Sequence, residues 1–481
     1  MTYINKRELV VIVKPEVGLR VGLAPIPNPS MSNGDVSPLI NLLQEFAGIK
    51  IRPLFGASEE RLKAATAVKP VAPIPNATIP DLSVFYQVEA PEELLDELAE
   101  RFRQMDFVEV AYVRPPIELP YFPVQGLSVQ PAEPPTISPN FTSLQGYLDA
   151  APGGIDAKFA WTIPGGRGTN VNIIDIERDW LVSHEDLFLN LGGLISGSAS
   201  GTVNDRNHGT AVLGVIGGDD NGFGITGIAP DAYVRCISPS LGFDAAIKLA
   251  ADILNPGDII LLEAQVYGPR YNFQPRSPNS QLGMIPVQYY PATYAAITYA
   301  TVIRGVIVVE AAGNGTEDLD DPLYSIPQPQ IGVLVSPFNR NIGDNASIIV
   351  GAGAPPIGTN GIDNGPDRSR LEFSNFGSCV DVQGWGAEVM TCGYGHKQGG
   401  SDERFWYTDK FGGTSAASPM VVGALACIQG ILKATGKPLL TPIAARQLLQ
   451  NNGSVQQSVP GRPSSQRIGN RPNLFLAIAG L

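Results

Sequence analysis

The sequence predicts an α/β protein in which a large, doubly wound and mostly parallel sheet follows a small α+β domain. After residue 155, short β-rich apolar runs alternate with helical stretches, a pattern typical of strands buried on both faces of a parallel sheet. The first 114 residues show strands and helices in a different order, and a proline-rich stretch separates the two parts. With 481 residues, of which 43% are hydrophobic and 16% charged, the chain can bury at least one large core.

The front domain, residues 1–114, contains four predicted strands and two predicted helices. The strands are expected at residues 9–13, 49–54, 84–88 and 108–113, and the helices at residues 39–46 and 92–102. In the second helix Leu94, Leu95, Leu98 and Phe102 fall on one face. The order βαββαβ predicts a ferredoxin-like domain.

Residues 115–154 are rich in proline and lack periodicity, which predicts an extended linker whose backbone forms neither helix nor sheet. The large domain is then expected over residues 155–481. Its buried strands are predicted at residues 171–174, 234–237, 259–262, 306–309 and 348–350.

Composition narrows the class of function and partner. A formal charge of −13 without any basic run disfavours nucleic acid, because phosphate binding needs clustered Lys and Arg. The apolar stretch at residues 9–13 is too short for a signal peptide, and no run reaches membrane-spanning length, so a cytoplasmic location is favoured over secretion. The four cysteines have no metal-type spacing, which favours free thiols over a Cys379–Cys392 disulfide.

Four segments carry the parts needed to hydrolyse a peptide bond with a hydroxyl group: a nucleophile, a base, a carboxylate that orients the base, and an oxyanion donor. NVNIID ends a buried strand at Asp175, and HGTAVLGVIGG begins an apolar helix at His208. VVEAAGNG runs from a strand into Asn314, and GGTSAASP places Ser415 at a helix start. Each fragment alone is also typical of a turn or a helix cap. Their joint occurrence, each beside a suitable element, predicts a catalytic set.

The segments IIDIE, HGTAVLGVIGG, GIAPDAYVRCI, VVEAAGNG and GGTSAASPM resemble the signature segments of the subtilisin family of serine peptidases, over roughly residues 155–481. The order of the acid, histidine and serine is also that of the family. The resemblance implies an endopeptidase that needs no cofactor for catalysis. It assigns Ser415 as nucleophile, His208 as general base and acid, Asp175 as orienting carboxylate and Asn314 as oxyanion donor.

The sequence departs from the family at three acidic positions. Ile176 and Glu177 replace small residues after the aspartate, Glu263 stands where a serine is frequent, and Glu310 stands where alanine is usual. Buried carboxylates are costly unless they are paired or protonated. One interpretation is a structural pair that shares a proton or contacts a buried base. The other is that Glu263 lines the cleft and favours basic substrates. The substrate-binding positions are then Glu263, Ala264, Gln265, Ala311 and Gly313. An acidic base, as in sedolisin-type peptidases, is disfavoured by the HGT and GN motifs.

The loop GGDDNGFGITGIAP resembles the calcium loop of the family, and Asp186 in SHEDL resembles the distal carboxylate of that site. The implied structural calcium would be held by Asp186, Asp219, Asn221, Phe223 and Ile225. Carboxylate, amide and carbonyl oxygens suit calcium. An ordinary polar turn is the alternative.

The front domain resembles the propeptide of the family by its topology. This implies a zymogen in which the domain acts as an intramolecular chaperone or inhibitor, with the tail after Val113 (RPPIELP) lying in the cleft. Proline near the junction would hinder self-cleavage, so a retained regulatory domain is an alternative. The expected partners are a protein or peptide substrate and the chain's own front domain, without nucleic acid or membrane. A non-catalytic binding protein and a peptidase dedicated to one cellular precursor are the rival hypotheses.

Overall fold

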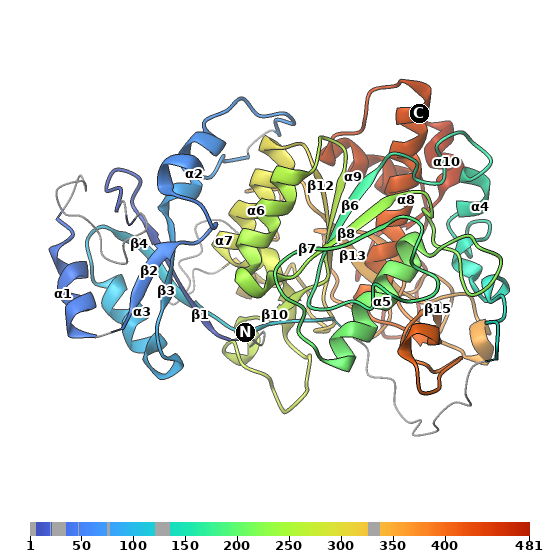
Figure 1. Ribbon diagram of the computed structural model, residues 1–481, viewed down its shortest axis with the longest axis horizontal. Coiled ribbons are helices and arrows are strands. Elements are labelled where there is room, and N and C mark those ends of the chain that lie inside the picture. Colours follow the sequence, from blue (N-terminus) through green and yellow to red (C-terminus); the bar gives the residue numbers. More distant parts are fainter. Residues whose placement is uncertain are drawn as a thin grey trace.

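A computed structural model describes residues 6–19, 21, 35–46, 48–74, 77–120, 135–325 and 337–481. Figure 1 shows a small domain, in blue, beside a larger domain built around a central sheet.

The front domain is an antiparallel sheet with the strand order β2-β3-β1-β4. Its elements are β1 (Glu8–Val13), α1 (Ser37–Glu45), β2 (Lys50–Pro53), α2 (Glu59–Thr66), β3 (Phe85–Glu89), α3 (Leu95–Arg103) and β4 (Val108–Arg114). The predicted ferredoxin-like arrangement is confirmed, with one added helix. We did not predict α2, because Leu62 is its single buried apolar residue and its sequence lacks an apolar stripe.

The large domain is built on a seven-stranded sheet in which every paired neighbour is parallel, in the order β14-β13-β12-β9-β6-β8-β7. The strands are β6 (Asn172–Ile176), β7 (Leu191–Ser196), β8 (Tyr233–Ile237), β9 (Ile259–Leu262), β12 (Ile307–Ala311), β13 (Ile348–Gly353) and β14 (Val380–Trp385). The predicted doubly wound fold is confirmed. The two outermost strands, β7 and β14, were missed because neither has the continuous apolar run of the central strands.

Helices cover both faces of this sheet. On one face, α6 (Phe243–Ile253) and α7 (Pro291–Thr298) pack over Ile174 and Ile260, and on the other α5 (Val203–Gly217) and α8 (Thr414–Thr435) pack over Ile173 and Leu261. Helix α8 is long and apolar enough to cross a membrane, but its apolar window is entirely buried inside the protein, as in a core helix. The remaining elements are α4 (Ala157–Ala160), β15 (Val389–Cys392), β16 (Tyr407–Phe411), α9 (Pro442–Asn451), β17 (Gly453–Ser454), β18 (Arg471–Pro472) and α10 (Leu474–Ala479).

The segment expected to be a linker is ordered at both of its ends. Strand β5 (Ile117–Glu118) pairs antiparallel with β10 (Gln265–Tyr267), which on its other side pairs with β11 (Met284–Pro286). At the far end, Tyr147 and Leu148 are buried in the core of the large domain. The prediction that this backbone forms no sheet is therefore wrong for β5, because an edge strand of the large domain supplies its hydrogen-bond partners. Residues 121–134 lie outside the described part of the chain.

The front domain packs directly against α6 and α7 (Figure 1). Arg114, at the end of β4, is 1% exposed and donates to both carboxylate oxygens of Asp244 on α6, at 3.0 and 2.9 Å. It also donates to Thr293 on α7 at 3.0 Å and forms an ion pair with Glu8. Apolar residues of both domains form one continuous buried cluster. The interface is therefore dry, with a buried ion pair at its centre.

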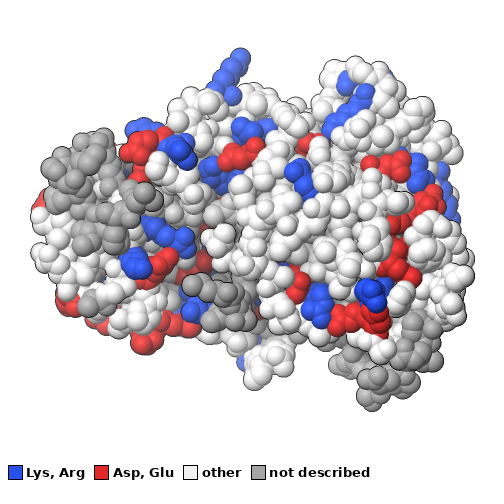
Figure 2. Space-filling model, in the orientation of Figure 1, with Lys and Arg blue, Asp and Glu red and all other residues white. Residues whose placement is uncertain are grey.

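Charges of both signs are interspersed over the surface. On the face shown in Figure 2, the described Lys and Arg residues lie singly or beside Asp and Glu, with wide uncharged areas between them. On this face the described acidic residues are therefore spread over several places rather than gathered in one patch.

Candidate active site

Ser415 lies in the first turn of α8 and is buried, with its hydroxyl donating to the backbone carbonyl oxygen of Pro120 at 2.7 Å. Gly413 precedes the helix with φ +108°, and a Cβ atom there would lie 2.4 Å from the same carbonyl oxygen. Glycine is therefore required for the carbonyl to approach the serine. The residue that contacts the predicted nucleophile thus comes from the front segment of the chain itself.

Asn314 holds the same carbonyl from a second direction. Its side-chain oxygen accepts from the backbone N–H of Thr414 at 3.0 Å, which fixes the orientation of the amide. Its Nδ2 then donates to the Pro120 oxygen at 2.7 Å. The structure therefore brings together Ser415 and Asn314 as predicted, around one carbonyl group that receives two hydrogen bonds.

His208 pairs with Glu177 rather than with Asp175. Its Nδ1 hydrogen-bonds to Glu177 Oε1, and both side chains are fully buried. Asp175 accepts instead from Trp180 Nε1 at 2.7 Å. The ring of His208 also packs edge-on against Phe411, four residues before Ser415, at a centroid distance of 5.6 Å. The prediction that Asp175 orients the histidine is therefore corrected to Glu177.

The geometry of β6 explains this correction. Asp175 is still inside the strand, paired with Cys236 and Leu261, whereas Glu177 is the first residue beyond its end at Ile176. Residues two apart point to the same face of a sheet, so both carboxylates face the side covered by α5. Only Glu177, which comes later in the chain and has the longer side chain, reaches His208. The rule that sites form beyond the carboxyl ends of strands would have selected Glu177, had the strand end been placed correctly.

Three carboxylic acids lie in this buried region: Asp175, Glu177 and Glu263. Burial raises the pKa of Asp175 to about 7. Burial, followed by the charges of Asp175 and Glu263, raises the pKa of Glu177 well above its ordinary value. Burial also lowers the pKa of His208 to about 3, so the imidazole is neutral, as a base that accepts a proton must be. The three acids titrate as a coupled group and are not all ionised at neutral pH.

Glu263 lies beneath the site and not in the cleft. It is 1% exposed, and its Oε1 accepts from Ser418 Oγ on α8 at 2.6 Å. Glu310 is fully buried and accepts from Ser347 Oγ at 2.7 Å. The expectation that Glu263 selects basic substrates is therefore wrong, because its carboxylate points into the protein. The two glutamates also do not form a pair, since each has its own serine donor.

Of the other predicted substrate-binding positions, Gln265 contacts the bound segment, and its Nε2 donates to the Leu119 carbonyl oxygen at 3.2 Å. Ala264 and Ala311 are buried beside it, and Gly313 donates its N–H to Thr414 Oγ1 at 3.2 Å. Two residues that sequence reasoning missed also lie here. Gln281 bonds to Gln265 at 2.5 Å, and Arg178 forms an ion pair with Glu118 at 3.1 Å. They come from a loop and a strand end without a motif, so no local signal identifies them.

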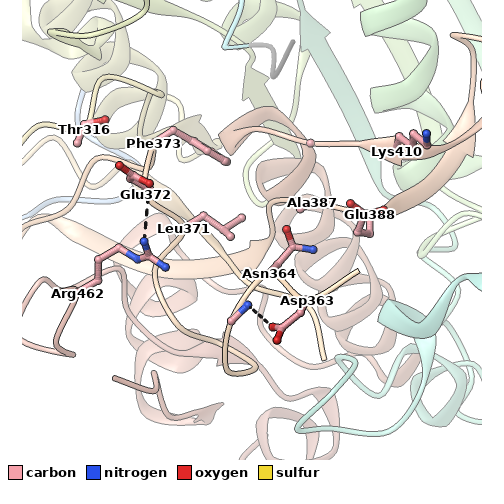
Figure 3. Close-up of a pocket in the computed structure, with 12 residues that line it drawn as sticks. Thr316, Asp363, Asn364, Leu371, Glu372, Phe373, Ala387, Glu388, Lys410 and Arg462 are labelled. Atoms are coloured by element: carbon pink, nitrogen blue, oxygen red, sulfur yellow. Dashed lines mark hydrogen bonds and ion pairs between the residues drawn. The ribbon is translucent and has the colours of Figure 1, made fainter. Parts of the chain in front are cut away.

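Figure 3 shows a cavity of about 650 Å³ near the site. It is lined by Thr316, two residues after Asn314, and by Gly412, three residues before Ser415. Its charged lining consists of Asp363, Glu372, Glu388, Lys410 and Arg462, with Arg462 directed at Glu372 in Figure 3. The described residues that line it belong neither to β5 nor to β10.

The loop that resembles a calcium site does not fit the ion. Asp186 accepts a hydrogen bond on each carboxylate oxygen, from Asn221 Nδ2 at 2.8 Å and from the backbone N–H of Ile225 at 2.6 Å. Phe223 N donates to the side-chain oxygen of Asn221 at 3.2 Å. Calcium needs oxygen atoms around it, and here N–H donors occupy the carboxylate.

Asp219, the remaining predicted ligand, bonds to Asp186 through its backbone, with its N–H donating to the Asp186 carbonyl oxygen at 2.9 Å. Its carboxylate accepts from the backbone N–H groups of Phe188 at 2.7 Å and Leu189 at 3.1 Å. The structure therefore brings Asp186, Asn221 and Ile225 together but leaves Asp219 in another role. These contacts match the ordinary polar turn that the sequence also allowed, and they add no support to the predicted calcium site.

Thermal unfolding tests whether the loop around Asp186 and Asn221 binds calcium. We expect the melting temperature to differ by less than about 2 °C between buffers with calcium and with EDTA, because calcium raises the stability of the folded state only if it binds there. Differential scanning calorimetry in both buffers measures the change. A large calcium-dependent increase would contradict the hydrogen-bonded turn.

The four cysteines are buried and free, as favoured from the sequence.

The model of the subtilase family matches residues 195–469, a range that includes His208, Asn314 and Ser415 but neither Asp175 nor Glu177. A calcium-dependent protease of Trichormus variabilis is 27% identical over 325 residues, covering 62% of this chain and 44% of that protein. An extracellular protease of Xanthomonas campestris is 27% identical over 376 residues, covering 70% of this chain and 56% of that protein. The chain thus spans about half the length of these relatives.

Two solved structures have a similar fold. Fervidolysin from Fervidobacterium pennivorans, a keratinolytic enzyme related to subtilisin, aligns with a TM-score of 0.53 and 18% identity, covering 100% of this chain and 62% of that one. The epidermin leader peptide processing serine protease EpiP from Staphylococcus aureus aligns with a TM-score of 0.52 and 17% identity, covering 98% of each chain. The family match extends over more than half of the residues and includes the serine, histidine and asparagine segments described above. The chain therefore belongs to the subtilase family.

Proposed function

We propose that this chain is a serine endopeptidase, made in a self-inhibited form, in which Ser415, His208, Glu177 and Asn314 act together. One observation carries the proposal. The carbonyl oxygen of Pro120 accepts hydrogen bonds from both Ser415 Oγ and Asn314 Nδ2, each at 2.7 Å. Acyl transfer requires the scissile carbonyl to lie beside a hydroxyl nucleophile and an oxyanion donor, and the Pro120 carbonyl lies beside both. Among the described residues His208 Nε2 has no hydrogen-bond partner, so it is free to take the hydroxyl proton when Ser415 turns towards it.

The reaction follows from the roles of these groups. Ser415 Oγ attacks the carbonyl carbon, and His208 Nε2 takes the hydroxyl proton. Glu177 accepts the Nδ1 hydrogen, which keeps Nε2 free for that proton and stabilises the imidazolium. Asn314 Nδ2 donates to the oxyanion. The C–N bond then breaks, the imidazolium gives its proton to the leaving amine, and water releases the acyl group from Ser415 by the same steps in reverse.

The front domain inhibits the enzyme in this proposal. Residues 117–120 fill the cleft, so no other peptide reaches Ser415 while β5 remains on β10. The bond after Pro120 is the one presented for self-cleavage.

Labelling with a fluorophosphonate probe and intact-mass measurement test the proposal together. We expect wild-type protein to be labelled at Ser415, and Ser415→Ala and His208→Ala to lose the label. We also expect wild-type protein to yield a front fragment that ends at Pro120, while Ser415→Ala keeps its full mass of 51.0 kDa.

The Arg114→Ala variant, which loosens the front domain, is the control. It distinguishes an active enzyme whose cleft is blocked from a protein that has no catalytic activity. If neither the wild type nor Arg114→Ala is labelled, the chain is a non-catalytic binding protein and the proposal fails.

A further inference from the structure

The cleft holds four residues of the chain's own sequence in the way a substrate would lie. Glu118 and Ile117 pair with Gln265 and Val266 of β10, Leu119 follows, and the Pro120 carbonyl meets Ser415. The residues that precede a cleaved bond are therefore represented here by the sequence Ile-Glu-Leu-Pro. The contacts of each position show which side chains the cleft accepts.

Three linked amide side chains lie at the backbone carbonyl groups of Leu119 and Pro120. Gln265 Nε2 donates to the Leu119 oxygen at 3.2 Å, and Asn314 Nδ2 donates to the Pro120 oxygen at 2.7 Å. Gln281 Oε1 accepts from Gln265 Nε2 at 2.5 Å and from Asn314 Nδ2 at 3.3 Å, and Gln265 Oε1 accepts from the backbone N–H of Asn314 at 2.8 Å. We call Gln265, Gln281 and Asn314 the amide wall. Because each member bonds to the next, none moves aside without losing a hydrogen bond.

The backbone behind the amide wall is tightly packed. A Cβ atom on Gly315 would lie 2.0 Å from the Met284 carbonyl oxygen, and one on Gly313 would lie 2.8 Å from Asn375 Nδ2. Strand β11, which carries Met284, therefore fills the space beneath the wall. Proline suits such a position because its side chain is compact and it brings no N–H that needs an acceptor. A long or aromatic side chain would have to displace the wall.

The position of Glu118, two residues earlier, faces a fixed cation. Arg178 forms an ion pair with Glu118 at 3.1 Å and also donates to the Ile117 carbonyl oxygen. Asp205 on α5 lies 3.8 Å from the same guanidinium, and the Arg178 side chain is only 12% exposed. A largely buried arginine whose position is fixed by a carboxylate of the protein favours a second carboxylate on the bound peptide. The cleft is therefore positive where Glu263 had been expected to make it negative.

From these contacts we infer that the enzyme cleaves after proline, within stretches that carry an acidic side chain two residues before that proline. This rests on the proposed peptidase function. Pro120 is selected by the amide wall and Glu118 by Arg178, so the two preferences come from different side chains and change independently.

Quenched fluorescent peptides offered to the full-length chain, as wild type and as Arg114→Ala in which the front domain is loosened, test the inference. Three peptides share one leaving segment and differ only in their first four residues, Ile-Glu-Leu-Pro, Ile-Glu-Leu-Phe and Ile-Lys-Leu-Pro. We expect the first to be cleaved at least tenfold faster, in kcat/KM, than either of the others. Equal or faster cleavage of the Phe peptide, or of the Lys peptide, overturns the inference.

Two enzyme variants separate the two preferences. Gln281→Gly opens the amide wall, so it should raise the rate on the Phe peptide relative to the Pro peptide by at least fivefold and leave the Glu to Lys ratio unchanged. Arg178→Glu should reverse the Glu to Lys order. Ratios are compared within each variant, because Arg178 adjoins Glu177 and its substitution changes the absolute rate. An unchanged ratio in both variants also overturns the inference.

Fluorophosphonate labelling of the same samples distinguishes a failure of the proposed specificity from a failure of the proposed peptidase function. Labelled protein that cleaves all three peptides alike contradicts the specificity and leaves the peptidase function intact. Protein that is neither labelled nor active on any peptide, also as Arg114→Ala, contradicts both.

Discussion

Replacing Glu177 by Gln should lower kcat/KM by about 10⁴-fold, as the loss of the orienting carboxylate does in other serine peptidases, while Asp175→Asn should lower it by less than about tenfold. Glu177 bonds to His208 Nδ1, whereas Asp175 bonds to Trp180. A glutamine amide donates to Nδ1 and places the ring hydrogen on Nε2, which then cannot take a proton from Ser415. An asparagine still accepts from the indole. Peptide hydrolysis by purified variants measures both values.

The melting temperatures of Glu177→Gln and Asp175→Asn show whether each variant is folded. Glu177 is a buried acid whose pKa is raised by burial, so its neutral replacement should not lower the melting temperature. A large loss of activity in Asp175→Asn, with Glu177→Gln close to wild type, would restore Asp175 as the partner of the histidine and refute the Glu177 assignment.

Replacing Arg114 by Ala should speed fluorophosphonate labelling of Ser415 by about 100-fold in the full chain. Removing one member of a buried ion pair costs about 3 to 5 kcal/mol, because the remaining charge stays buried without its partner. Asp244 is 1% exposed in the closed protein and regains water only when the front domain moves away. The substitution therefore weakens the closed state, and a cost of about 3 kcal/mol corresponds to about 100-fold.

Arg101→Ala is the matched control for this experiment. Arg101 also lies in the front domain and bonds to Glu45, but both side chains are exposed and the pair lies within that domain. Exposed pairs contribute little to stability, so labelling should be unchanged. If Arg114→Ala is labelled no faster than Arg101→Ala, the buried pair does not hold the domain closed.

Local patterns were enough to predict the central architecture. The runs that became β6, β9, β12 and β13 are short and mostly apolar, as expected of strands in the middle of a sheet that helices cover on both faces. Strand β8 is partly exposed, at Tyr233 and Arg235. Ser415 and Asn314 were identified because a glycine-rich turn beside a helix start or a strand end leaves a recognisable sequence. The edge strands and α2 were missed because polar residues or glycines interrupt their apolar runs, as in VDVQGW of β14, which is nonetheless buried throughout.

The partner of His208 could not be predicted, because it depended on where β6 ends. Moving the strand end by two residues exchanges Asp175 for Glu177 on the same face, and the sequence IIDIE permits both. The contact between Pro120 and Ser415 joins residues 295 positions apart. No local pattern encodes such a contact. The resemblance to the family implied that RPPIELP lies in the cleft, but which residue of it meets Ser415 depends on the placement of two domains. The same holds for the carboxylate of Glu263, whose direction was set by Ser418 on a distant helix.

The pairing of β5 with β10 has a consequence for any protein that this chain would cut. When β5 leaves, β10 becomes the open edge of a small sheet, with backbone N–H and C=O groups that lack partners. Whatever takes the vacated place must present its own backbone as an extended strand. A segment locked in a helix cannot do so until it unwinds. Local unfolding of the target, and not its surface exposure alone, would therefore decide which bonds are reached.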